Sequence, residues 1–466
     1  MLETFQEKRG NADMVRRKIL FTLLALCLML TACGANDKST TSGSSENKTQ
    51  TSGSSGDSAG AKKPIELSFY YPVQVGGPVT AIIDRMTAEF TEENPDIIVK
   101  PIYAGSYSDT KVKVQAAVMS NTPPDVAVLL ATDLFDFLDM DAIIPLDEYV
   151  EKEGGEAFLN EFYPAWIENS QANGHTYSIP FQRSTVVMYY NKDAFREVGL
   201  DPERPPQTWD ELLEYAKKLT KDGRWGIELP SNGPTSFNWI FQAFAIQNGT
   251  TYDNLINADG TEAYFHTPEN VEALTFWNDL IHTHKVMPEG IIEWGTVPSD
   301  FTEGKAAMIY HTTGNLTNIK NNAKFDFGVA MLPAGRQLGT PTGGGNFYLF
   351  KGTPKEKQDA AWEFIKFMTT PERAAAWSKE TGYVAIKPAA YETELMKEYV
   401  QEFPFVTVAR DQLPYAKREI STHNYGRVAK ALNDNMQAVL LGAMTPEEGL
   451  QKAQQEADEA LKTFKK

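Results

Sequence analysis

Residues 65–103, IELSFYYPVQVGGPVTAIIDRMTAEFTEENPDIIVKPIY, contain the hydrophobic patterns that indicate the fold class. The two ends, Ile65–Tyr71 and Ile97–Tyr103, are short runs rich in β-branched and aromatic residues, which is typical of strands. Between them, apolar residues recur every three or four positions from Val79 to Phe90, the spacing of an amphipathic helix, and Asn94-Pro95 ends it. The stretch therefore predicts a strand–helix–strand unit.

The same alternation of strands and helices continues along the chain. Lys111–Met119 predicts a second helix, and VAVLL at Val126–Leu130 is a continuous apolar run of the kind found in buried parallel strands. Later segments of the same style are the strands Val186–Tyr190, Ala306–Tyr310 and Phe327–Leu332, a helix opening at Thr208 and a helix at Ala360–Met368. This order predicts a doubly wound α/β fold, in which ligands lie at the carboxyl ends of the strands.

Composition limits the classes of function. The chain has 466 residues and a formal net charge of −18, and 42% of its residues are apolar, which predicts a globular protein of two or three structural units. The acidic surplus argues against nucleic acid as a partner, because phosphate binding needs a basic face. The two cysteines, Cys27 and Cys33, both lie near the N-terminus, so no disulfide is expected in the body of the chain.

The N-terminal region, residues 1–32, is predicted to be a bacterial lipoprotein signal peptide. A basic cluster, Arg16-Arg17-Lys18, precedes the apolar run Ile19–Leu30, which is too short to span a bilayer. Small residues then lead to Cys33, the predicted lipidation point, where two or more acyl chains would hold the protein stably on a membrane. The residues before Met14 fit no part of this pattern, so translation is expected to start there.

Residues 33–64 are predicted to be a flexible, lipid-anchored tether. From Gly34 to Lys63 the segment is dominated by Ser, Thr, Gly and other short polar residues, and it contains no aromatic or large aliphatic residue that would form a core. A tether between an anchor and a folded body predicts a protein that works at the extracytoplasmic face of the cell membrane.

The motif content favours binding over catalysis. The chain contains no P-loop, no Gly-x-Ser-x-Gly elbow, no His-Glu-x-x-His and no dinucleotide-binding Gly-x-Gly-x-x-Gly. His282 and His284 are close in sequence, but a pair without a nearby third ligand does not predict a metal site. Among so many carboxylates a glycosidase-like pair arises easily by chance, so it gives little support for a hydrolase. The sequence predicts a binding protein without cofactor or metal, and not an enzyme.

Several stretches carry a resemblance to a known family. They are ENPD at Glu93–Asp96, PFQRSTVVMYYNKDAF at Pro180–Phe195, GLDPERPPQTWDEL at Gly199–Leu212, AKFDFGVAMLP at Ala323–Pro333 and ETGYVAIKPAAY at Glu380–Tyr391, with GNL-x-NI at Gly314–Ile319 as a narrower match. From about Ile65 onward the chain resembles the extracellular solute-binding proteins of ABC importers, and within them the members that bind glycerol-3-phosphate.

The resemblance implies a two-lobed, periplasmic-binding-protein-like (type II) α/β fold with a hinged cleft between the lobes. The chain is expected to cross between lobes near Ile179–Arg183 and near Gly343–Asn346. The implied bounds are residues 65–180 and 345–385 for lobe 1, and residues 181–344 and 386–466 for lobe 2. The resemblance also implies a monomer that binds a small molecule and delivers it to the permease subunits of an importer.

The ligand-contacting positions of the family fall on Tyr107, Ser184, Thr312, Gly344, Tyr383 and Arg427. The Arg427 guanidinium is expected to grip phosphate oxygens with its planar fork. The two hydroxyls are expected to donate from opposite sides of the cleft, and the glycine to let a backbone N–H approach the anion. The tyrosines offer phenolic donors and flat faces. The implied ligand is glycerol-3-phosphate or a glycerophosphodiester.

Two positions depart from the family. Its glycerol-binding carboxylate aligns with Ala131, so Asp133 is expected to supply a carboxylate from the same strand end. Its cleft tryptophan aligns near Ser236, and Trp239 is the nearest indole. Both changes weaken selection for free glycerol-3-phosphate and leave room for a head group. Arg183, beside the first crossing, offers a second cation outside the family pattern.

A neutral sugar or oligosaccharide is the alternative ligand. Tyr70, Tyr71, Trp239 and Trp294 are aromatic residues that can stack on sugar faces, although core packing is the simpler explanation for at least half of them. Arg427 separates the two hypotheses, because a neutral ligand gives a buried guanidinium no anion to pair with. An extracellular hydrolase is the third class, and turnover of glycerophosphocholine would reveal it.

Overall fold

The computed structural model describes residues 63–465 except residues 234, 250, 251 and 253. The predicted signal peptide, Cys33 and nearly all of the predicted tether lie outside the described residues. In the part of the chain that is described, no helix combines the length and the apolar character needed to cross a membrane.

The predicted β-α-β-α-β start is confirmed in its strands, which have the predicted bounds. Strands β1 (Ile65–Tyr71), β2 (Ile97–Tyr103) and β3 (Val126–Leu130) are parallel, with β1 in the middle. All of β3 is buried, as its continuous apolar run predicts. Helix α2 (Val79–Glu93) buries the predicted apolar side chains against the sheet.

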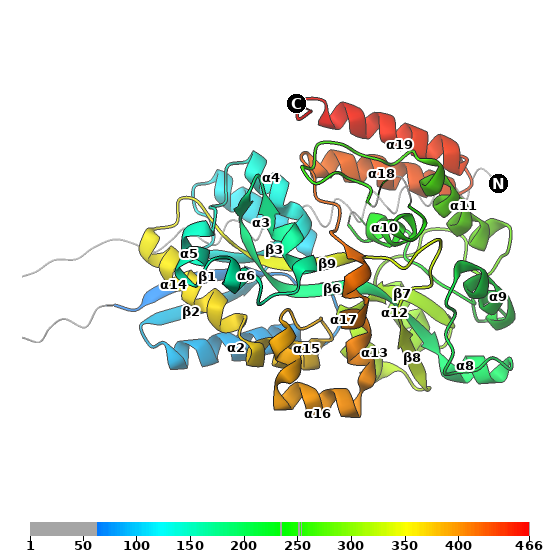
Figure 1. The fold of residues 1–466 in the computed structure, drawn as a ribbon, viewed down its shortest axis with the longest axis horizontal. Coiled ribbons are helices and arrows are strands. Elements are labelled where there is room, and N and C mark those ends of the chain that lie inside the picture. The colour runs from blue at the N-terminus through cyan, green and yellow to red at the C-terminus, as the bar shows by residue number, and fades with distance from the viewer. Residues whose placement is uncertain (1–62, 234, 250–251, 253, 466) are drawn as a thin grey trace, which may run out of the picture. The chain divides into compact units, whose positions relative to one another are not determined.

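Two long strands join this unit to the rest of the sheet. Strand β9 (Thr340–Leu349) pairs antiparallel with β3, and β6 (Ser178–Asn191) pairs antiparallel with β9. Beyond β9, β6 continues to pair with β7 (Met308–Thr312) and β8 (Phe327–Ala330), so the main strand order is β2-β1-β3-β9-β6-β7. Figure 1 shows β6 and β9 running between a group that contains β1 and β2 and a group that contains β7 and β8. The fold is a two-lobed α/β fold.

Helices surround the sheet in both groups (Figure 1). With β1 lie α2, α3 (Tyr107–Met119), α4 (Leu134–Asp139), α5 (Asp147–Lys152), α6 (Glu156–Leu159), α14 (Lys355–Met368) and α15 (Pro371–Thr381). The short helix α7 (Pro164–Ile167) packs against β6. With β7 lie α8 (Lys192–Glu197), α9 (Trp209–Leu219), α10 (Ser236–Asn248), α11 (Pro268–His282), α12 (Thr296–Thr302), α13 (Leu316–Asn322), α18 (Tyr425–Leu440) and α19 (Pro446–Leu461). The remaining elements are the ribbon β4 (Gln171–Ala172) and β5 (His175–Thr176), helices α16 (Glu394–Glu402) and α17 (Val408–Gln412), and β10 (Ala416–Lys417), which pairs with β9.

Both predicted crossings lie within the shared strands, Ile179–Arg183 in β6 and Gly343–Asn346 in β9. The sequence predicted only the apolar part of β6, Val186–Tyr190, yet every residue of the strand is buried, including its polar first half. That half carries hydrogen-bonding side chains because it passes between the lobes. The predicted lobe bounds themselves stay a prediction.

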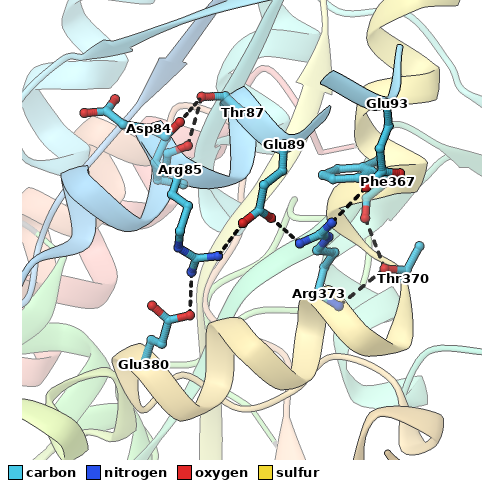
Figure 2. Close-up of polar contacts among 10 residues, drawn as sticks. Asp84, Arg85, Thr87, Glu89, Glu93, Phe367, Thr370, Arg373 and Glu380 are labelled. Carbon is cyan, nitrogen blue, oxygen red and sulfur yellow. Dashed lines mark hydrogen bonds and ion pairs between the residues drawn. The ribbon is translucent and has the colours of Figure 1, made fainter. Parts of the chain in front are cut away.

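An ion-pair network fixes α15 on α2 (Figure 2). Arg85 pairs with Glu89 at 2.9 Å and with Glu380 at 2.5 Å, and Arg373 pairs with Glu89 from the other side. Helix α15 ends at Thr381, and the chain then leads directly to Tyr383, one of the predicted binding residues. The network therefore holds the helix that delivers this side chain.

Candidate functional site

Five of the seven predicted binding residues line one cavity of about 50 Å³. They are Tyr107, Ser184, Thr312, Gly344 and Tyr383. We call this space the inner cavity; its lining also includes Gln74, Val75, Trp239, Trp294 and Glu419. It lies where β6, β7 and β9 meet the loop after β1 and the end of β3.

The two hydroxyl residues lie on neighbouring strands and therefore on the same side of the cavity. Thr312 ends β7 opposite Val186 of β6, and Ser184 precedes Val186 by two residues. The expectation that they donate from opposite sides of the cleft is wrong, because antiparallel pairing of β6 with β7 brings them together. Thr312 Oγ1 accepts a hydrogen bond from the Gly314 N–H at 3.1 Å, which leaves its own hydrogen for a ligand.

Two tyrosines come from the other group of elements. Tyr107 is the first residue of α3, which begins earlier than predicted because Ser106 caps the helix with its side chain. Tyr383 follows α15 and its ring stacks on Trp377, with centroids 6.0 Å apart. Burial raises the pKa of Tyr107 well above its ordinary value and that of Tyr383 to about 12, so both phenols remain neutral donors.

The backbone conformation and the close approach of the paired strand explain why residue 344 is a glycine, without reference to a ligand. Its φ is +93°, and a Cβ at this position would lie 1.8 Å from the carbonyl oxygen of Gln182 on the paired strand. Its carbonyl accepts a hydrogen bond from Arg183 Nη1 at 3.2 Å. Arg183 is fully buried over the Trp166 ring and also donates to Asn346 Oδ1, so the predicted second cation holds the crossing strands.

Indole rings form another wall. Trp239 and Trp294 lie with ring centroids 6.1 Å apart, and Trp239 Nε1 donates to the Thr342 carbonyl at 2.7 Å. These are two of the four aromatic residues considered for sugar stacking. The other two, Tyr70 and Tyr71, are in β1 and do not line the cavity as described.

Glu419 is the one carboxyl in the described lining of the inner cavity. Its backbone N–H donates to Asn169 and Thr342 side chains, which fixes the chain at this point. Its Oε2 is buried without a hydrogen-bond partner among the described atoms. Burial raises the pKa of Glu419 to about 8, and the nearby Arg183 opposes this shift. No motif or spacing in the sequence marks this residue, so the sequence does not predict its place in the site.

A wider outer groove of about 430 Å³ adjoins the inner cavity and shares Tyr107, Leu130 and Thr235 with it. Asp133, the sixth predicted residue, lines this groove rather than the inner cavity, together with Lys111, Phe237 and Tyr425. Lys111 Nζ lies 2.9 Å from Asp133 Oδ1, whereas Oδ2 is buried and has no partner among the described atoms. Burial raises the pKa of Asp133 although the Lys111 charge opposes it.

Comparison with known proteins gives the family. The model of the bacterial extracellular solute-binding proteins matches residues 85–404. The chain belongs to this family. Its members bind small molecules and deliver them to the permeases of ABC importers, so the chain is a transport protein and not an enzyme.

Relatives of this solute-binding protein include two of known name. The sn-glycerol-3-phosphate-binding periplasmic protein UgpB of Salmonella typhimurium is 30% identical over 418 residues, which cover 86% of this chain and 93% of that protein. UgpB of Escherichia coli K12 is 29% identical over 424 residues, covering 87% and 94%.

Solved structures share the fold. UgpB from Mycobacterium tuberculosis in complex with glycerophosphocholine matches with a TM-score of 0.76 and 24% identity, covering 87% of this chain and 100% of that one. The cyclic alpha-maltosyl-1,6-maltose binding protein from Arthrobacter globiformis matches with a TM-score of 0.74 and 25% identity, covering 86% and 100%.

Arg427 is exposed on α18 of this solute-binding protein and belongs to the described lining of neither the inner cavity nor the outer groove. The same helix buries Tyr425, Val428 and Leu432, whereas Gly426 and Lys430 on either side of Arg427 line the outer groove. A phosphate clamp by Arg427 therefore stays a prediction.

Proposed function

We propose that this solute-binding protein binds a neutral oligosaccharide in its cleft. The main support is the described lining of the inner cavity. It has two tryptophans, two tyrosines and a carboxyl but no Lys, Arg or His. Aromatic faces with a few polar groups suit the apolar faces and hydroxyls of a sugar. A phosphate, by contrast, needs a cation or several charge-assisted donors to offset its desolvation.

The outer groove supports a ligand longer than one sugar unit. It continues directly from the inner cavity, and Phe237, Tyr425 and the unpaired oxygen of Asp133 repeat the same combination of rings and carboxylate. A monomer anchored through lipidated Cys33 on the extracytoplasmic face delivers the ligand to its permease. The sequence pattern around that cysteine supports the anchor.

Glycerol-3-phosphate or a glycerophosphodiester is the second candidate. It is favoured by the meeting of five family ligand positions at one cavity and by the glycerol-3-phosphate and glycerophosphocholine that its UgpB relatives bind. The hydroxyls of Ser184 and Thr312 and the Tyr383 phenol would then bind the phosphate in the inner cavity, and the only cations in the described linings would be Lys111 and Lys430 of the outer groove.

Titration calorimetry with maltotriose, glycerol-3-phosphate and glycerophosphocholine separates the candidates. Maltotriose is expected to bind, and Trp294→Ala to weaken it about tenfold or more through lost ring contact. Trp225→Ala, an indole outside both spaces, is the matched control and is expected to bind like the unsubstituted protein. Binding of a phosphate ester alone would replace the oligosaccharide by the second candidate.

A further inference from the structure

A short turn connects the two walls of the inner cavity. Thr312 lines the cavity and begins the 3₁₀ turn Thr313–Asn315, which lies at the start of the GNL-x-NI motif. A Cβ at Gly314 would lie 2.9 Å from Tyr383 Cζ and 3.2 Å from Val75 Cγ1. The turn therefore rests directly on side chains from the β1 side of the cleft, and its glycine permits this approach.

Hydrogen bonds lead from the β1 side through this turn to a cavity indole. The Gly76 N–H donates to Asn315 Oδ1 at 3.3 Å, and Asn315 Nδ2 donates to His311 Nδ1 at 3.0 Å. His311 Nε2 in turn donates to the Trp294 carbonyl at 3.1 Å. The imidazole also lies against the Trp294 ring, with centroids 3.7 Å apart.

Only one state of His311 satisfies both bonds. Nδ1 must accept from the Asn315 amide and Nε2 must carry the proton, so the imidazole is neutral and in one tautomer. The ring is fully buried, and this burial lowers the pKa of His311 to about 3. The geometry at Trp294 thus depends on how Asn315 is oriented.

The loop that orients Asn315 fits closely against the motif. A Cβ at Gly76 would lie 2.7 Å from Cγ of Asn318, and the three side-chain atoms of Asn318 beyond Cβ are the nearest atoms to it. Asn318 Nδ2 also approaches Asn315 Oδ1 at 3.5 Å. A side chain at position 76 would therefore require either the Asn318 side chain to rotate or the loop to move away from Asn315.

We propose that the Gly76–Asn315–His311–Trp294 relay couples closure of the cleft to the shape of the inner cavity. Docking of the Gly76 loop orients the Asn315 amide, Asn315 fixes the imidazole, and His311 holds Trp294 in its place on the cavity wall. Asn315 and His311 are positioning residues in this scheme. The relay does not depend on whether the ligand is a sugar or a phosphate ester.

A steric double-substitution cycle tests the docking step. Gly76→Ala is expected to weaken binding about tenfold and to abolish the decrease in radius of gyration on ligand addition, because the closed state is penalised. Asn318→Ala, which removes the obstructing atoms, is expected to change little by itself and to restore both readouts in the double variant. Maltotriose and glycerophosphocholine are the probes, and the one that binds the unsubstituted protein is used. Unchanged binding and closure in Gly76→Ala, or no rescue, would overturn the proposal.

Imidazole NMR tests the positioning step without any ligand. The chain has six histidines, and His311→Gln identifies the relevant signal. In the unsubstituted protein this signal is expected to show the Nε2–H tautomer and no titration across neutral pH. In Asn315→Leu the imidazole is expected no longer to be held in the Nε2–H tautomer. Asn322→Leu changes an exposed asparagine of the same helix region and is expected to leave the His311 signal unchanged. An unaltered His311 signal in Asn315→Leu contradicts the relay even if neither probe binds.

Discussion

The phenol of Tyr107 donates a hydrogen bond to Gln182 Oε1 across 2.8 Å and so ties α3 to the crossing strand β6. Tyr107 is nearly buried and Gln182 fully so. The carbonyl oxygen of the same glutamine is the atom that forbids a side chain at Gly344. Gln182 of β6 therefore contacts two residues of the inner-cavity lining, Tyr107 of α3 and Gly344 of β9.

Tyr107→Phe is expected to destabilise the fold by about 1–3 kcal/mol, because it leaves a buried amide oxygen without a donor. Urea unfolding measures the loss. Tyr103→Phe is the matched control, since that ring is 54% exposed at the end of β2. Equal stability of the two variants would contradict the assigned role of the Tyr107 hydroxyl.

Glu419 gives stability a dependence on pH. The pKa of its carboxyl is about 8 in the folded chain against an ordinary 4.5, so between these values the folded state holds a proton that the unfolded state has lost. The free energy of unfolding should therefore fall as pH rises from about 4.5 to about 8. Glu419→Gln is expected to flatten this decline, and thermal melts at acidic and mildly alkaline pH detect it.

The exposed Glu398 supplies a control for that experiment. Glu398→Gln is expected to keep the decline of the unsubstituted protein. A decline that persists in Glu419→Gln would show that another group binds the proton.

The network in Figure 2 predicts a modest, salt-dependent contribution to stability. Arg85 and its partners Glu89 and Glu380 have side chains 42%, 30% and 37% exposed, so water screens them. Arg85→Gln is expected to lower the free energy of unfolding by about 1 kcal/mol or less at low ionic strength. The difference should shrink at high salt, which denaturant titrations in both conditions measure. A loss that grows with salt would argue against an electrostatic origin.

Lipidation at Cys33 predicts where the protein is found. Cys33→Ala is expected to release it from the membrane fraction without changing its thermal unfolding, because the described body contains no cysteine. Fractionation with intact mass spectrometry measures both retention and modification. Unmodified mass together with unchanged retention in the variant would exclude the acyl anchor.

Local pattern was sufficient for the first strands but not for the site. The sequence predicts the bounds of two strands correctly, Ile65–Tyr71 and Val126–Leu130. This is possible because the apolar residues that each strand buries are its own consecutive or alternating residues. The first half of β6 was not predicted, since its buried polar residues acquire partners only from β9, far along the chain. The family resemblance placed five binding residues that the structure brings together. Arg427 lies outside both described linings, so its role stays a prediction, and the resemblance gave no sign of Glu419.

The position of β9 has a consequence for how the chain matures. It fills the space between β3 and β6, although residues 131–177 separate β3 from β6 and a further long segment separates β6 from β9. Neither the β1 part nor the β6 part of the sheet has all its strands until β9 emerges from the ribosome. Contacts between segments so far apart in the chain form slowly. A nascent chain with this topology remains unfinished through most of its synthesis. Delayed folding of this kind suits membership of an extracellular family, because a polypeptide that is exported while still extended must not complete its fold early.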